Sequence, residues 1–154
     1  MYIQRTIEKS IERANKFFPV VLVTGPRQVG KTTVLQNCET QPRTYVSLDT
    51  LENRELAKND PTLFLQRYPA PVLIDEIQYA PELFPYIKAS VDKEKKNGMY
   101  WLTGSQQFHL MKNVSESLAG RVGILQLEGL SQDEKNGHPD VPPFLPTEEY
   151  IKTK

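Results

Sequence analysis

The sequence predicts an α/β fold in which a mainly parallel sheet of five strands is covered by helices on both sides. Three observations support this prediction. Short apolar segments, rich in β-branched residues, alternate with segments of helical periodicity five times along the chain. The apolar segments are continuous, which is typical of strands that are buried on both faces. The chain has 154 residues and is 38% hydrophobic, which suffices for a single packed core.

The first elements surround a glycine-bearing loop. Isoleucines recur at helical spacing over residues 3–18, and charged residues fill the other positions, so an amphipathic helix is expected there. The run VVLVT over residues 20–24 predicts the first strand. The loop follows, and a helix is expected after it, over about residues 30–38.

The remaining elements repeat this alternation. Asp60 and Pro61 predict a helix start, because aspartate caps a first turn and proline suits its first position. Asn97 and Gly98 predict a helix end. Further strands are expected over residues 44–48, 71–75, 99–103 and 122–127. Further helices are expected over residues 51–58, from residue 60 onward, over 81–96 and, in two pieces, over 106–119.

The chain changes character after Leu130. Residues 131–154 are polar, contain four prolines and show no clear periodicity. We therefore expect residues 1–130 to form the folded domain. Residues 131–154 are expected to be a polar tail or linker, or the start of a second domain.

The composition limits the classes of partner. Nineteen Lys and Arg balance 19 Asp and Glu, and a net charge of zero gives no electrostatic argument for nucleic-acid binding. No apolar run approaches the ~20 residues of a membrane span, and the first residues lack the apolar core of a signal peptide. The single cysteine, Cys38, cannot form an internal disulfide and is expected to be a buried apolar residue. These features predict a cytoplasmic protein without membrane attachment.

A glycine-rich loop carries the clearest functional motif. Residues 25–32 read GPRQVGKT and match G-x-x-x-x-G-K-[ST] between a predicted strand and a predicted helix. Glycines let the backbone approach phosphates and point its N–H groups at them. Lys31 is expected to reach the β- and γ-phosphates, and Thr32 to give its hydroxyl to Mg²⁺. The residues expected to bind the nucleotide are Gly25, Pro26, Arg27, Gln28, Val29, Gly30, Lys31, Thr32 and Thr33.

The strand predicted over residues 71–75 ends in two acids, Asp75 and Glu76. At the carboxyl edge of a parallel sheet, such side chains face the ligand crevice. Asp75 is expected to hold Mg²⁺ together with Thr32, directly or through water. Glu76 is expected to orient or deprotonate the water that attacks the γ-phosphate.

Four further residues are candidates for the site. Ser105 and Gln106 follow the fourth predicted strand and are candidates to lie beside the γ-phosphate; a helix cap at Ser105 with a solvated Gln106 is the alternative. Arg121 is a candidate charge-stabilising arginine, in cis or across a subunit interface, with a surface arginine as the alternative. Arg27, inside the phosphate loop, is a candidate to contact phosphate or a partner acid.

Four motifs together resemble a known family. GPRQVGKTT, VLIDEIQ, WLTGSQQF and SESLAGR occur in this order, and they resemble the ATP-binding domain of AAA-like P-loop ATPases of bacteria and archaea. The resemblance covers residues 1 to about 130. It implies a three-layer P-loop sandwich with strand order 5-1-4-3-2, which a helical lid and a C-terminal domain normally follow.

The resemblance also implies roles for individual residues. It assigns Asp75 to the metal and Glu76 to hydrolysis. Gln106 falls at the position of a polar sensor residue, where many relatives carry asparagine. Arg121 matches the arginine of the SLAGR stretch.

These features predict an ATPase module that binds Mg-ATP and hydrolyses it as a conformational switch. The residues expected to serve catalysis are Glu76, Lys31, Gln106 and Arg121. The expected ligands are ATP, ADP and Mg²⁺, and a second copy or a partner protein is a further expected class of partner. Two alternatives stay open: a nucleotide-dependent regulator of DNA or of a partner protein with little hydrolysis, and a small-molecule phosphotransferase.

Overall fold

The computed structural model describes residues 4–27 and 29–129, and residues 7–129 form one compact unit. Strands and helices alternate along this unit, as the sequence predicts. In chain order the elements are α1 (Glu8–Phe17), β1 (Val20–Thr24), α2 (Lys31–Asn37), β2 (Thr44–Ser47), α3 (Leu51–Asn59), α4 (Pro61–Arg67), β3 (Val72–Asp75), the short 3-10 helices η1 (Ile77–Tyr79) and η2 (Pro81–Leu83), α5 (Phe84–Glu94), β4 (Tyr100–Gly104), α6 (Phe108–Leu118) and β5 (Val122–Gln126).

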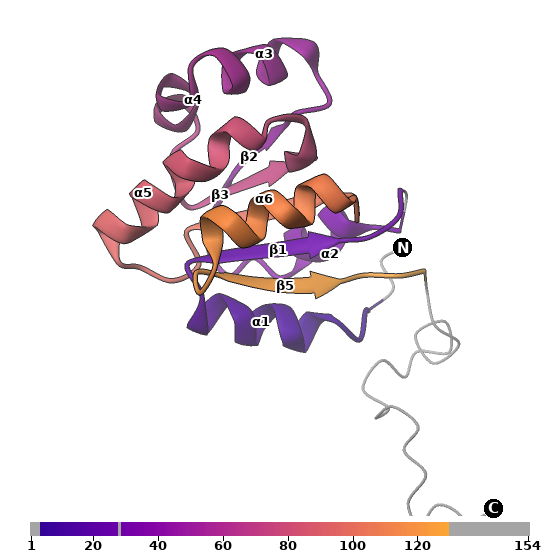
Figure 1. Ribbon diagram of the computed structural model, residues 1–154. Coiled ribbons are helices and arrows are strands. Elements are labelled where there is room, and N and C mark those ends of the chain that lie inside the picture. The colour runs from indigo at the N-terminus through magenta and orange to yellow at the C-terminus, as the bar shows by residue number, and fades with distance from the viewer. Residues whose placement is uncertain (1–3, 28, 130–154) are drawn as a thin grey trace, which may run out of the picture. The chain divides into compact units, whose positions relative to one another are not determined.

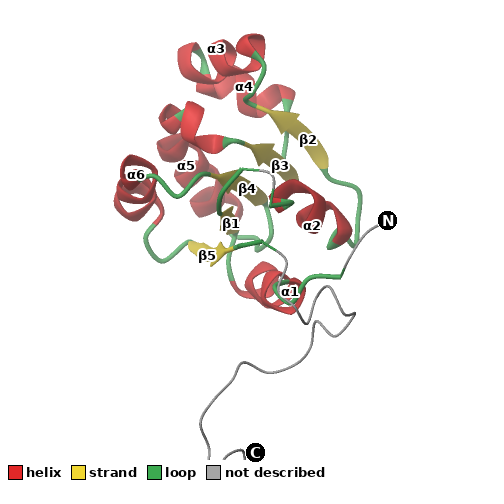
Figure 2. Cartoon of the chain, turned by 90° about the vertical axis from the view of Figure 1, so that its right-hand side faces the viewer, coloured by secondary structure: helices red, strands yellow, loops and turns green. Residues whose placement is uncertain are grey.

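The five strands form one parallel sheet in the order β2-β3-β4-β1-β5. This is the predicted order, read from the other edge. Figure 1 shows β5 beside β1, and Figure 2 shows β4 on the other side of β1, so the strand before the phosphate loop is an interior strand of the sheet. Because all strands run in one direction, their carboxyl ends lie at the same edge, where ligands bind in open α/β sheets.

Helices cover both faces of the sheet, as Figure 2 shows. Alternate residues of β1 point to opposite faces, so Val21 packs with α1 and α2 while Leu22 packs with the cluster that includes α3 to α6. All five residues of β1 are buried. The continuous apolar sequence of this strand is therefore explained by burial on both faces, as predicted.

Three helix predictions were wrong in their bounds. Helix α1 begins at Glu8 rather than at residue 3, and residues 6 and 7 form a turn before it. The isoleucine spacing continues outside the helix, so periodicity alone does not mark its start. Helix α6 is one continuous element rather than two pieces, and no glycine or proline lies inside it to interrupt it. The helix expected over 81–96 is a 3-10 turn followed by α5.

Other local predictions are confirmed. Asp60 caps α4, because its side chain accepts a hydrogen bond from the backbone N–H of Leu63 at 3.1 Å, and Pro61 is the first residue of that helix. The predicted tail, residues 131–154, lies outside the described residues.

The environment of Cys38 predicts an inert thiol. Burial, and then the negative charges of Glu8 and Glu12, raises the pKa of the Cys38 thiol to about 12. At pH 8 the folded chain therefore carries about a thousandfold less thiolate than an ordinary cysteine. We expect a chromogenic disulfide reagent to react slowly with the native chain and at the normal rate in denaturant. Equal rates in the two conditions would contradict this environment.

Candidate functional site

The phosphate loop connects the end of β1 to the start of α2. The structure describes this loop except for Gln28. Gly30 immediately precedes α2 and has φ of 92° and ψ of 29°, a left-handed conformation that glycine adopts without strain. The loop therefore ends in a turn that leads directly into Lys31, the first residue of the helix.

Position 25 requires glycine because the backbone of Leu127 lies close to it. A Cβ atom at this position would lie 2.1 Å from the carbonyl oxygen of Leu127, which is closer than any side-chain carbon can come. Leu127 is itself fixed, since its N–H donates to the carbonyl of Thr24 at 2.8 Å. The sequence predicts glycine here for contact with phosphate, and the structure adds contact with the chain after β5.

Gly25→Ala is therefore expected to destabilise the fold. Backbone atoms must move to admit the methyl group, which costs roughly 1–3 kcal/mol in the free energy of unfolding. Gly129→Ala is the matched control, because no atom of the described residues lies within 4 Å of a Cβ at that position. Thermal unfolding of both variants checks the prediction, and equal melting temperatures would contradict it.

Lys31 is enclosed by its own loop. The residue is 6% exposed, and its Nζ donates to the carbonyl oxygens of Gly25 at 2.8 Å and Pro26 at 3.0 Å. An ammonium group has three donor hydrogens, so two are used here and one stays available. The side chain is thus held over the loop, at the place where the motif predicts contact with phosphates.

Thr32 and Asp75 meet although 43 residues separate them. The Thr32 hydroxyl donates to Asp75 Oδ1 at 2.7 Å. A hydroxyl oxygen and a carboxylate oxygen are the hard ligands that Mg²⁺ prefers, and Mg²⁺ in such sites takes its other ligands from phosphates and water. The two residues therefore fit a magnesium ion. No group of three His, Cys, Asp or Glu side chains that could hold a metal occurs in the described ranges 4–27 and 29–129.

Asp75 has two further partners that the sequence analysis did not identify. Tyr45 on β2 donates its hydroxyl to Oδ2 at 3.1 Å, and Thr103 on β4 donates to Oδ1. Burial, and then the charge of Asp75, raises the pKa of Tyr45, so the phenol stays a neutral donor at neutral pH. Asp75 is thus held from both neighbouring strands. The strand order is the signal that could have identified these partners, because it places β3 between β2 and β4.

Glu76 adopts a strained backbone conformation. Its φ of 63° and ψ of 52° lie in the left-handed region, which is uncommon for residues other than glycine and costs free energy. Its N–H donates to the hydroxyl of Thr103 at 2.9 Å, and its Oε2 accepts from Gln78 Nε2 at 2.5 Å. The acid side chain therefore has a fixed direction, which Gln78 sets. Sequence analysis also missed Gln78, which lies in the same motif.

The structure places the polar residues after β4 differently: Gln106 is solvated, as in the alternative left open above, whereas Ser105 is not a helix cap. Helix α6 begins at Phe108 with Gln107 in the capping position, so Ser105 does not cap it. The Ser105 N–H donates to Gln78 Oε1 at 3.3 Å, and its hydroxyl oxygen is buried without a hydrogen-bond partner among the described residues. Gln106 is exposed and accepts from Gln126 at 3.2 Å. Ser105, rather than Gln106, is thus connected to Glu76, through Gln78.

Arg121 lies away from the phosphate loop. It directly precedes β5, at the edge of the sheet where the strands begin, and its carbonyl accepts from Val20, the first residue of β1. Its guanidinium pairs with Asp92 at 2.7 Å and 3.0 Å, which lowers the pKa of that carboxyl. The structure therefore does not bring Arg121 to the phosphate loop of the same chain. A role across a subunit interface stays a proposal, and it requires the pair with Asp92 to open.

The other loop residues are also placed. Arg27 is exposed, and it donates to the hydroxyl of Tyr79 at 3.1 Å rather than to an acid. Thr33 lies in the first turn of α2, where its carbonyl accepts from Asn37 at 3.0 Å. Val29 is partly buried and packs against the cluster under α1 and α2. The loop thus presents one exposed cation, Arg27, and one enclosed cation, Lys31.

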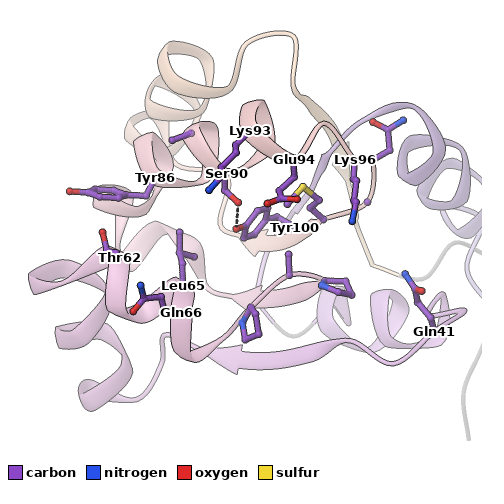
Figure 3. A pocket seen from close by; sticks show the side chains of 17 residues that line it. Gln41, Thr62, Leu65, Gln66, Tyr86, Ser90, Lys93, Glu94, Lys96 and Tyr100 are labelled. Atoms are coloured by element: carbon purple, nitrogen blue, oxygen red, sulfur yellow. Dashed lines mark hydrogen bonds between the residues drawn. The ribbon is translucent and has the colours of Figure 1, made fainter.

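A cavity of about 920 Å³ lies at the edge of the sheet where the strands begin, opposite the edge that carries the phosphate loop. Helices α4 and α5 contribute Leu65, Tyr86 and Lys93 to its lining, and Figure 3 shows Tyr100 donating to Ser90 within it, at 2.9 Å. No described residue of the phosphate loop, and neither Asp75 nor Glu76, lines this cavity. The assignment of the candidate nucleotide site therefore rests on the geometry of its motifs and not on this cavity.

Within residues 4–27 and 29–129, no helix has the length and apolar character needed to cross a bilayer.

Comparison with known proteins supports the family that these motifs indicate. A family model described as "AAA domain" matches residues 17–136. The chain is 37% identical over 130 residues to uncharacterized protein Mb2031c of Mycobacterium bovis and, to the same extent, to uncharacterized protein Rv2008c of Mycobacterium tuberculosis. Each match covers 83% of this chain and only 29% of the relative. The family match spans the phosphate loop, the two acids and the segment leading into β5, and the chain belongs to the AAA domain family.

Proposed function

We propose that this chain binds Mg-ATP at the phosphate loop and hydrolyses it as a conformational switch. The observation that carries the proposal is the contact between Thr32 and Asp75, at 2.7 Å, beside the enclosed ammonium of Lys31. These residues come from two motifs 43 positions apart, and the contact brings the two expected Mg²⁺ ligands together. Membership of the AAA domain family supports nucleotide binding at this place.

The residues have complementary roles in this proposal. Backbone N–H groups of the loop and the Lys31 ammonium bind the phosphate oxygens. Thr32 and Asp75 hold Mg²⁺, which when bound neutralises charge on the β- and γ-phosphates. Tyr45 and Thr103 keep the Asp75 carboxylate oriented toward Thr32.

Glu76 accepts a proton from the attacking water. The water oxygen bonds to the γ-phosphorus, the bond from that phosphorus to the bridging oxygen of ADP breaks, and the proton passes to the Glu76 carboxylate. Gln78 donates to Oε2, and no donor among the described residues is bonded to Oε1. Oε1 is therefore the oxygen that we assign to the water.

A second candidate function is a nucleotide-dependent binding module with little or no hydrolysis. One observation favours it: the short hydrogen bond from Gln78 to Glu76, at 2.5 Å, already occupies one oxygen of the acid. Such a module would change its affinity for a partner protein, or for a second copy of itself, on exchange of ATP and ADP. The nucleotide site is the same in both candidates.

Phosphate release in the presence and absence of Mg²⁺ tests the proposed hydrolysis. We expect the full chain to release phosphate from ATP only when Mg²⁺ is present, and a single-turnover experiment detects even a slow reaction. Binding of ATP without phosphate release over many hours would favour the binding module over the ATPase. Release that does not depend on Mg²⁺ would contradict the assignment of Thr32 and Asp75.

A further inference from the structure

Arg27 is a cation that has no acidic partner in the part of the chain that the structure describes. Its Nη2 donates to the Tyr79 hydroxyl at 3.1 Å, and no ion pair with Arg27 occurs among the described residues. A neutral phenol does not compensate a guanidinium charge. The phosphate loop therefore carries a full positive charge in addition to that of Lys31, on an exposed side chain.

Tyr79 is held in place by a second arginine. The guanidinium of Arg54, on α3, stacks over the Tyr79 ring at 3.8 Å from its centre. Arg54 is itself fixed, because its Nε donates to the carbonyl of Leu48 at 3.1 Å and its Nη2 to that of Asp49 at 3.5 Å. The Tyr79 hydroxyl is thus a rigid acceptor for Arg27.

The position of this acceptor relates Arg27 to the reacting groups. Tyr79 belongs to η1, three residues after Glu76, and Arg27 belongs to the loop whose carbonyls hold Lys31. The hydrogen bond from Arg27 to Tyr79 therefore joins the phosphate loop to the segment that carries the acid. A guanidinium in this position has several donors for the equatorial oxygens of a γ-phosphoryl group, where charge develops during transfer.

We propose that Arg27 supplies, from the same chain, the charge that stabilises the transferring γ-phosphoryl group, and that Tyr79 is the positioning residue that holds Arg27 for this role. The inference rests on the proposed function and extends it, since Arg121 lies at the opposite edge of the sheet and pairs with Asp92. An arginine that acts on developing charge must interact more strongly with the transition state than with bound ADP.

Binding of ADP with Mg²⁺ and aluminium fluoride, a mimic of the planar phosphoryl group, tests this role directly. We expect Arg27→Ala to weaken the aluminium fluoride complex by about 100-fold or more while the affinity for ADP changes by less than about threefold. Arg27→Lys should recover only part of the loss, because lysine lacks the planar set of donors. Tyr79→Phe removes only the hydroxyl and should weaken the same complex by about three- to tenfold.

Arg67→Ala, which removes an exposed arginine at the end of α4, is the matched control and should leave both affinities unchanged. Equal losses for ADP and for the fluoride complex would overturn the proposal, because Arg27 would then be a general phosphate ligand. No loss in Arg27→Ala, or an ADP-binding wild type that forms no fluoride complex, would also overturn it. A wild type that binds no nucleotide would instead refute the proposed function itself.

Discussion

Lys31→Ala is expected to lower the affinity for Mg-ATP by about 100-fold or more. The ammonium makes two charge-assisted contacts with phosphates in the proposed complex, each worth roughly 1.5–3 kcal/mol, and 1.4 kcal/mol corresponds to a factor of ten. The side chain is 6% exposed and is already directed over the loop by the carbonyls of Gly25 and Pro26. On binding, one of these two donors turns from its carbonyl to a phosphate oxygen, and the third donor, which is already available, makes the other phosphate contact. Titration with ATP and Mg²⁺ measures the loss.

Two further variants make this result interpretable. Lys31→Met keeps the apolar stem of the side chain and removes only the charge, so it should bind as weakly as Lys31→Ala while retaining the native melting temperature more closely. Lys58→Ala removes an exposed lysine from α3 and should bind like the wild type. Wild-type affinity in a folded Lys31 variant would contradict the assignment of this loop to phosphates.

Glu76→Gln is expected to stop turnover while sparing nucleotide binding. Loss of a general base typically lowers the rate by about a hundredfold to ten-thousandfold, and the affinity for ATP should change by less than about threefold. The fold should persist, since the new amide can turn its oxygen toward Gln78 Nε2 and keep the bond that now measures 2.5 Å. Single-turnover phosphate release and ATP titration, performed on one preparation, measure the two effects separately.

Glu82→Gln is the matched control for this experiment. Glu82 is an exposed acid on η2, outside the site, and its variant should hydrolyse ATP like the wild type. Unchanged phosphate release in Glu76→Gln would show that another group accepts the proton of the water. A parallel loss of binding would show that Glu76 contributes to the structure of the site rather than to the reaction.

The sequence predicted the fold where local pattern and burial agree. The strand over 20–24 is apolar up to Thr24 because both of its faces are buried, and that pattern identifies an interior strand of a parallel sheet. The order of the strands came from the family resemblance, not from periodicity. Helix bounds were less accurate, as at α1, because the apolar spacing continues past the point where the helix begins.

The site was predictable where short sequence motifs carry it. Lys31, Thr32 and Asp75 come together as their motifs imply. The supporting contacts were not predictable in this way, because Tyr45 and Thr103 reach Asp75 from strands that are adjacent only in the folded sheet. Their side chains give no periodic signal of their own.

Arg121 illustrates the opposite case. Its motif resembles that of the family, but the start of β5 lies a full strand length from the phosphate loop, and strand direction decides the distance. A sequence motif identifies residue types, whereas the edge of the sheet at which a residue lies depends on the topology.

Calorimetric titration of the full chain with ATP, with and without Mg²⁺, tests the nucleotide site most directly. We predict saturable binding at a single site that strengthens when Mg²⁺ is present and is lost in Lys31→Ala. If the folded wild-type chain shows no binding of ATP or GTP at millimolar concentration with Mg²⁺ present, the assignment of residues 25–33 to a triphosphate is wrong.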